Sequence, residues 1–199
     1  MSTTLFLVRH GETVWHAENR YAGVSDVALT ERGHHQAARL AAWAQKAELD
    51  AVWASPLSRA RATAAPAAQA LGLPVEVDPG LAELDFGSAE GRTLAELPPG
   101  QAAAFRADPV GGAFPGAEDP RAAAARGSAA LRRIADRHPG GRVLVVAHNT
   151  LLRLVLCDLL GIPLARYRTA FPLLRNCSPA ELVMNEAGPG LVALNAPLP

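Results

Sequence analysis

Thr3-Thr-Leu-Phe-Leu-Val8 is followed at once by Arg9-His10-Gly11 near the start of this chain. A run of β-branched and apolar residues without alternation is typical of a strand that is buried on both faces, as in a parallel sheet. The polar residues that follow it then lie at the carboxyl end of the strand. This stretch therefore predicts a buried strand that delivers Arg9 and His10 to one edge of a sheet.

Further strands and helices alternate along the chain. This alternation predicts an α/β fold, a three-layer αβα sandwich with a mostly parallel central sheet and helices on both faces. No linker or repeat interrupts the pattern, so we expect one domain over residues 1–199. Strands are expected at 51–54, 73–77 and 142–147. A hairpin of 181–185 and 191–194 is expected around a Gly-Pro-Gly turn. Helices are expected from an N-cap at Thr30 to about Lys46 and at 59–71, 101–107, 120–137 and 150–160.

Two segments depart from regular patterns. Pro66 lies inside the second helical segment, where it predicts a kink or a break. Residues 79–120 are rich in glycine and proline, and long irregular stretches in compact domains often line binding sites.

The composition excludes several classes of partner. Hydrophobic residues make up 49% of the chain and 19 lysines and arginines balance 19 acidic residues, so no net basic charge is present to bind nucleic acid or an anionic membrane. The best candidate for a membrane segment, residues 151–160, is too short to span a bilayer and contains Arg153 and Asp158. Cys157 and Cys177 have no metal-like spacing, and packing is the expected role of Cys157. We therefore expect a cytoplasmic protein.

Polar clusters follow three of the expected strands. They are Arg9-His10-Gly11, the turn that begins at Ser55, and His148-Asn149. Ligands of open α/β sheets bind at the carboxyl ends of the strands, so one crevice can hold all three clusters. There His10 could attack phosphorus with one ring nitrogen while a backbone carbonyl holds the other. Arg9, Arg59 or Arg61, and His148 could bind the phosphoryl oxygens.

Glu83 is the candidate proton donor for a leaving group. It stands in Leu81-Ala-Glu-Leu-Asp-Phe-Gly87, where partial burial would raise the pKa of its carboxyl group. Each candidate also has a structural interpretation when it is taken alone. A histidine at a strand end is usually a structural group, an arginine beside it is often a surface ion-pair partner, and such a glutamate most often faces solvent.

The longer patterns resemble the histidine phosphatase (phosphoglycerate mutase-like) superfamily, and in particular its short bacterial members of phosphatase type. The resemblance covers most of the chain, from Leu5 to about Arg153, in the family's order and spacing. The matching segments are Leu7-Val-Arg-His-Gly-Glu-Thr13 with Trp15, Arg20, Gly23, Asp26 and Leu29-Thr-Glu-Arg-Gly33; Ser55-Pro-Leu-Ser-Arg-Ala-Arg-Ala-Thr63; Leu81-Ala-Glu83 with Phe86-Gly87 and Glu90-Gly91; and Val143-Leu-Val-Val-Ala-His-Asn-Thr-Leu-Leu-Arg153.

The resemblance implies a phosphohistidine intermediate on His10. By its pattern, Arg9, Arg59 and His148 would hold the phosphoryl oxygens, and Glu83 would protonate the leaving group and then activate water. The family requires no metal, and we expect no cofactor. The expected partners are a small phosphorylated metabolite or inorganic phosphate, and the protein is expected to be a monomer or a homodimer.

Substrate contacts are expected from His16, Arg20, Gly23, Arg61 and Asn149. Two of these positions depart from the family. Many members carry asparagine where this chain has His16, whose imidazole can also donate a hydrogen bond. Glycine is common where this chain has Asn149, which could make a side-chain contact or cap the helix that starts near Thr150, and we favour the cap. The remaining histidines, His34, His35 and His138, are expected to face solvent.

The sequence favours hydrolysis over the mutase reaction. Mutases of this type are longer and cover the pocket with extra segments, whereas residues 91–120 are short and carry few charges with which to bind a triose carboxylate. Short members of the family include broad phosphomonoesterases and enzymes that act on nucleotide-loop intermediates of cobalamin synthesis. Wall residues are expected from 15–23 and 92–118, with Arg20, Phe86, Arg92, Phe105 and Phe114 as candidates.

The sequence disfavours three other classes of protein. A non-catalytic module that binds a phospholigand is disfavoured because His10, Arg59 and Glu83 are all present. No glycine-rich fingerprint for a nucleotide follows any strand. The G-x-S-x-G elbow of serine hydrolases is also missing from the sequence.

Overall fold

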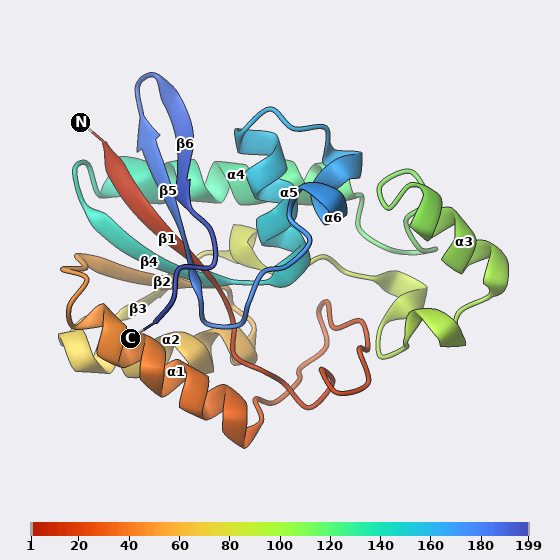
Figure 1. The fold of residues 1–199 in the computed structure, drawn as a ribbon, viewed down its shortest axis with the longest axis horizontal. Coiled ribbons are helices and arrows are strands. Elements are labelled where there is room, and N and C mark those ends of the chain that lie inside the picture. The colour runs from red at the N-terminus through yellow and green to blue at the C-terminus, as the bar shows by residue number, and fades with distance from the viewer. Residues whose placement is uncertain (1, 199) are drawn as a thin grey trace.

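The computed structural model describes residues 2–198 and has one six-stranded sheet. The strands run in the order β3-β2-β4-β1-β5-β6, and the first four of these are parallel to one another. Strand β5 pairs antiparallel with β1, and β6 pairs antiparallel with β5. Figure 1 shows the sheet at the centre and the segment around α3 projecting to one side. The strands are β1 (Thr3–Arg9), β2 (Ala51–Ala54), β3 (Val75–Val77), β4 (Arg142–Ala147), β5 (Pro179–Asn185) and β6 (Gly188–Ala193).

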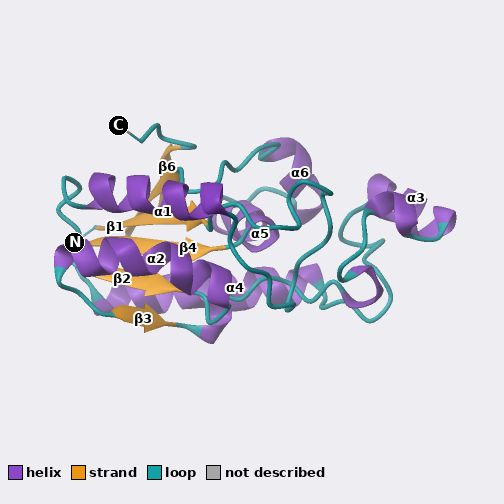
Figure 2. Ribbon diagram, turned by 90° about the horizontal axis from the view of Figure 1, so that it is seen from below, coloured by secondary structure: helices purple, strands orange, loops and turns teal. Residues whose placement is uncertain are grey.

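Helices cover both faces of the sheet, so the predicted α/β sandwich is confirmed (Figure 2). The longer helices are α1 (Glu31–Ala44), α2 (Ser58–Leu71), α3 (Pro99–Ala107), α4 (Pro120–Arg137), α5 (Asn149–Leu159) and α6 (Tyr167–Ala170). Short 3-10 turns occupy Pro79–Leu81, Gly87–Ala89, Leu94–Glu96 and Leu164–Arg166.

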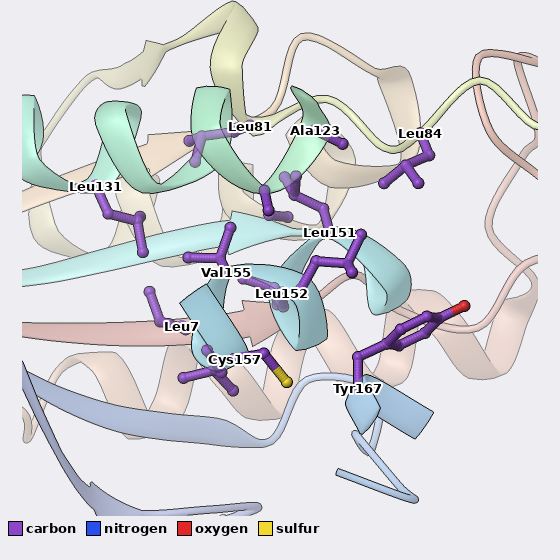
Figure 3. Close-up of a cluster of buried hydrophobic side chains, with 14 of the residues drawn as sticks. Leu7, Leu81, Leu84, Ala123, Leu131, Leu151, Leu152, Val155, Cys157 and Tyr167 are labelled. Atoms are coloured by element: carbon purple, nitrogen blue, oxygen red, sulfur yellow. The ribbon is translucent and has the colours of Figure 1, made fainter. Parts of the chain in front are cut away.

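The alternation of side chains along β1 explains the two cores. Leu5 and Leu7 point to the face covered by α4 and α5, whereas Phe6 and Val8 point to the face covered by α1 and α2. Figure 3 shows the first core, where leucines of α4 and α5 pack together and Cys157 lies among them. Cys157 is fully buried, as its apolar surroundings in the sequence predicted.

Helix α1 begins where the sequence predicted. The Thr30 hydroxyl accepts a hydrogen bond from the Gly33 amide at 3.0 Å, which caps the first turn. The break expected at Pro66 is absent, because α2 runs without interruption from Ser58 to Leu71. Within residues 2–198, no helix combines the length and the apolar character that crossing a bilayer requires.

The C-terminal hairpin forms, but its turn lies elsewhere than predicted. Asn185 pairs with Gly188, so the turn is formed by residues 186–187 and the Gly-Pro-Gly segment begins β6. The Asn185 side chain accepts from the Ala187 amide at 2.8 Å and so supports this tighter turn. Pro189 is tolerated in β6 because this strand is at the edge of the sheet, where one side needs no donor.

Candidate active site

The carboxyl ends of three neighbouring strands bring the predicted residues together. Arg9 ends β1 and His10 follows it, Ser55 follows β2, and His148 follows β4. These strands are neighbours in the order β2-β4-β1, so the three clusters meet at one edge. The rings of His10 and His148 lie 5.2 Å apart between centroids, and both side chains are buried.

The tautomer of His10 is fixed by its own loop. Its Nδ1 lies 2.7 Å from the Gly11 carbonyl oxygen, which can only accept, so Nδ1 carries the proton and Nε2 keeps its lone pair. Burial, followed by the charges of Arg59 and Arg9, lowers the pKa of His10 well below its usual range. His10 is therefore a neutral imidazole with a free nitrogen. The backbone carbonyl that the sequence analysis expected is that of Gly11.

Arg59 lies beneath the site with its guanidinium almost fully buried. Its two terminal nitrogens donate to the carbonyls of Ala22, Gly23 and Ser25 at 2.7–3.0 Å. Its Nε is buried and has no hydrogen-bond partner within residues 2–198. One N–H of this cation therefore remains available for a bound oxyanion. Gly23 takes part through its backbone, since a Cβ there would lie 2.1 Å from the Leu84 carbonyl oxygen.

Arg9 is the second cation beside His10. Burial lowers its pKa to about 10, so the guanidinium stays charged at neutral pH. Its Nη1 donates to the Leu174 carbonyl at 3.1 Å and its Nη2 lies 2.7 Å from His16 Nε2. No partner within the described chain meets its Nε.

His16 accepts from Arg9 where the sequence analysis expected a donor. Burial, followed by the charge of Arg9, lowers the pKa of His16 to about 4, so its ring is neutral. His16 Nε2 accepts from Arg9, while Nδ1 lies 3.0 Å from the Thr13 amide nitrogen and 2.8 Å from the Thr13 hydroxyl. His16 lines the cavity and orients the guanidinium of Arg9.

Glu83 reaches the site from the loop after the 3-10 turn at Pro79–Leu81. Its carboxylate accepts from the amides of Thr150 and Leu151 at 2.9 and 2.8 Å, at the start of α5. Burial nevertheless raises its pKa above the usual range of a glutamate. Arg126 holds the loop in place, because it donates to the Ala82 and Glu83 carbonyls at 2.7 and 3.2 Å. A carboxyl group of this kind can carry a proton at a pH where an exposed glutamate cannot.

Asn149 does not cap α5, contrary to our expectation. The helix already includes Asn149, and Glu83 occupies the first free amides in its place. The Asn149 side chain lines the cavity, and its Oδ1 has no hydrogen-bond partner within residues 2–198. This arrangement supports the alternative that Asn149 makes a side-chain contact with a ligand.

The remaining expected residues are divided between the site and the surface. Arg20 lines the cavity and pairs with Glu18 and Glu96. Arg61 is exposed on α2, outside the cavity lining, so the geometry gives no support to a substrate contact. His34 and His35 are exposed as predicted, but His138 is half-buried and accepts from the Trp53 indole at 3.2 Å.

A cavity of about 410 Å³ opens above His10. The predicted wall contributes Phe86 and Phe105 together with residues 15, 16 and 19–22, while Arg92 and Phe114 stay outside the lining. The sequence did not predict a second part of the wall, which comes from α5 and the segment after it. Its members are Thr150, Arg153, Tyr167, Arg168 and Pro172.

Three polar residues around the histidines also went without a predicted role. Ser55 Oγ lies 2.7 Å from His148 Nε2, and the Thr63 hydroxyl accepts from the Gly11 amide at 3.0 Å. Asn176 Nδ2 donates to the His10 carbonyl at 2.6 Å. Ser55 and Thr63 stand within the quoted motif 55–63, which was the available signal, whereas nothing in the pattern around Asn176 distinguishes it.

Comparison with known proteins agrees with this geometry. The model of the histidine phosphatase superfamily (branch 1) matches residues 5–197. A protein of Cronobacter sakazakii named "Probable phosphoglycerate mutase GpmB" is 38% identical over 177 residues, which are 87% of this chain and 81% of that protein. Among solved structures, Bacillus stearothermophilus YhfR superposes with a TM-score of 0.91 at 29% identity, covering 98% of both chains. The mycobacterial glucosyl-3-phosphoglycerate phosphatase in complex with VO3 gives 0.88 at 29% identity, covering 98% of this chain and 99% of that one.

Proposed function

Because this chain belongs to the histidine phosphatase superfamily, we propose that it is a phosphomonoesterase that acts on a small phosphorylated metabolite through a phosphohistidine at His10. One observation carries the proposal. The neutral, buried His10 has a free Nε2 and is under the charges of Arg9 and Arg59, each of which has an N–H with no partner within the described residues.

In the first step, His10 Nε2 attacks phosphorus and the bond from phosphorus to the ester oxygen breaks. Arg9 and Arg59 stabilise the negative charge on the equatorial oxygens, and His148 donates from Nδ1, which is buried and has no partner within residues 2–198. The leaving alkoxide takes the proton of Glu83, whose raised pKa keeps this proton available.

In the second step, water attacks the phosphohistidine. Glu83, now a carboxylate, accepts a proton from the water as the bond between phosphorus and nitrogen breaks. Inorganic phosphate leaves and His10 Nε2 regains its lone pair. The cycle uses side chains alone, and we propose that it needs no metal ion.

Hydrolysis is favoured over the mutase reaction by the wall of the cavity. Of residues 91–118, Phe105 alone belongs to the cavity lining, so this segment adds no cover of polar side chains to exclude water. The mutase reaction remains the second candidate, since relatives such as that of Cronobacter sakazakii carry a mutase name. The same active-site residues serve both reactions.

The test is phosphate release from p-nitrophenyl phosphate and a panel of metabolite monoesters, with and without EDTA. We expect hydrolysis that resists the chelator, and its loss by a factor of about 10⁴ or more in His10→Ala. Trapping with ³²P-labelled substrate is expected to label wild type and not the variant. Isomerisation of 3-phosphoglycerate without release of phosphate would replace hydrolysis by the mutase reaction, and full activity of His10→Ala would overturn both.

A further inference from the structure

The cavity has more positive charge than a single phosphoryl group needs. The charges of Arg9 and Arg59 act on His10, and Arg20 is paired with Glu18 and Glu96. Two further cations, Arg153 and Arg168, also line the cavity. No ion pair within residues 2–198 includes either of them.

Arg153 is held with its guanidinium incompletely bonded. It projects from α5 one turn after Asn149, and both side chains line the cavity. Its Nη2 donates to the Pro172 carbonyl at 2.9 Å, while its Nε is buried without a partner in the described chain. Burial is the main cause that lowers its pKa, and the charge of Arg168 adds to this effect. Such a buried guanidinium has lost its hydration without gaining a full set of hydrogen-bond partners. A bound anion therefore stabilises it more than it would stabilise an exposed arginine.

Arg168 is placed at the mouth of the same cavity. Its guanidinium carbon lies 5.1 Å from the centroid of the Phe105 ring, a cation–π contact that holds the charge beside the cavity wall. Tyr167, next to it in α6, packs against α5, and Figure 3 shows its hydroxyl turned away from the hydrophobic core. The segment 167–168 therefore adds positive charge to the wall of the cavity beside Phe105.

We infer that the substrate is a phosphomonoester with a second anionic group, which Arg153 and Arg168 bind. This inference rests on the proposed function for its phosphoryl site and adds the chemical class of the rest of the molecule. A carboxylate or a second phosphate would both satisfy the two arginines. The cavity volume of about 410 Å³ is within the usual range for sites that bind a small metabolite.

Binding to the His10→Ala protein tests the inference without requiring turnover. The probes are glycerol 3-phosphate, 3-phosphoglycerate and glycerol 1,3-bisphosphate, which share a three-carbon skeleton and differ in the second group. We expect one or both of the probes with a second anionic group to bind at least about tenfold more tightly than glycerol 3-phosphate in titration calorimetry, since hydrogen bonds to charged groups are the stronger ones. The probe that gains identifies the second anion as a carboxylate or a phosphate.

Substitution of the arginines then locates the effect. The Arg168 side chain is exposed. Arg168→Met is expected to lower the affinity for the preferred probe about tenfold and to change the affinity for glycerol 3-phosphate by less than about twofold. Arg153→Met is expected to do the same, with Arg153→Lys as a milder version that keeps the charge. Arg132→Met, at an exposed position of α4 away from the cavity, is the matched control and should change nothing.

Equal affinity for all three probes would overturn the inference, as would an equal loss for all three in both arginine variants. These outcomes are distinct from failure of the proposed function. An enzyme that does not hydrolyse any monoester can still show the binding preference. Conversely, hydrolysis that depends on His10 with no preference among the probes would leave the phosphatase in place and remove the second anion.

Discussion

Two hydrogen bonds decide which ring nitrogen is free in the paired histidines of the site. Gly11 fixes His10, as its carbonyl can only accept. The partner of His148 is Ser55, whose hydroxyl lies 2.7 Å from Nε2 and itself accepts from the Leu57 amide at 3.2 Å. If the hydroxyl proton points to Nε2, the proton of the imidazole is on Nδ1, where it can be donated to a phosphoryl oxygen.

Ser55→Ala should therefore slow catalysis, although Ser55 acts through His148 and does not itself contact the substrate. We expect a fall in kcat of about 10- to 100-fold, because the donor of His148 loses its fixed tautomer, with little change in KM. Ser55→Thr, which keeps the hydroxyl, should recover part of the rate. A variant that changed KM alone, or that matched wild type at all pH values, would show that Ser55 is a packing residue.

Glu83→Gln should separate two classes of substrate. With alkyl phosphates, whose leaving group needs a proton, we expect kcat to fall by about 10²- to 10⁴-fold. With p-nitrophenyl phosphate, the leaving group needs little help, so a rapid burst of p-nitrophenol should survive. Burst amplitudes in stopped-flow experiments measure this difference, and an equal loss for both substrates would argue against a role in proton donation.

Glu83→Gln is expected to slow catalysis but not to lower the stability of the protein at neutral pH. The pKa of Glu83 is raised in the folded protein, so its contribution to stability is present below the ordinary carboxyl pKa and is lost as pH rises through the raised value. We expect Glu83→Gln to be at least as stable as wild type at pH 7, with the advantage vanishing near pH 4. Urea unfolding at both pH values measures it. Glu118→Gln removes the ion pair in which Arg126 Nε lies 2.7 Å from the Glu118 carboxylate. It should therefore lower the free energy of unfolding by about 0.5 kcal/mol at pH 7.

At the scale of elements, the start of α1 is pressed against the loop of the nucleophile. A Cβ on Gly33 would lie 2.1 Å from the Glu12 carbonyl oxygen, and one on Gly11 would lie 2.7 Å from the Gly33 carbonyl oxygen. The backbones of these two segments are therefore in direct contact. The Thr63 hydroxyl ties the same loop to α2 through the Gly11 amide.

Gly33→Ala should destabilise the protein, although alanine is normally the better helix former. We expect a loss of about 1–3 kcal/mol in the free energy of unfolding, because the clash is with backbone atoms that cannot rotate away. Gly100→Ala, in α3 with no atom within 4 Å of its Cβ, should stabilise by up to about 1 kcal/mol. Urea denaturation of both variants measures the contrast, and equal effects would show that the loop moves freely.

Elements with a strong local pattern could be predicted from sequence, and those fixed by distant contacts could not. The bounds of α4 and β4 were predicted to the residue, because a long amphipathic helix and a continuous apolar strand need little context. Helix α6 was missed because its four residues pack against α5 and carry no period of their own. His10, Arg59 and Glu83 were found through motifs, whereas Asn176 and the wall at 167–172 depend on how the late part of the chain returns to the site.

At the scale of the whole molecule, three histidines at one edge of the sheet stay neutral in the folded state. Burial lowers the pKa of His10 and of His148 well below the usual range, and that of His16 to about 4. In the unfolded chain the same side chains titrate near about 6.5. The unfolded state then binds more protons below this pH, and the free energy of unfolding falls as pH drops.

Thermal unfolding should therefore show a melting temperature that declines from pH 7 to pH 5. His16→Asn should flatten this decline, because it removes one of the groups that the fold keeps unprotonated. His34→Asn is the control, since His34 is exposed in the fold. A decline that is unchanged in His16→Asn would place its origin in other groups.

The hydrogen bond from Asn176 to the carbonyl of His10 joins the loop of the nucleophile to a segment that is made 166 residues later. Strand β5, which covers one edge of β1, is made later still. A nascent chain on the ribosome therefore holds a complete nucleophile loop long before it holds the residues that fix it. Until β5 emerges, the edge of β1 that it covers is open to other strands. The loop of the nucleophile is therefore fixed only after residues 176–185 have been made.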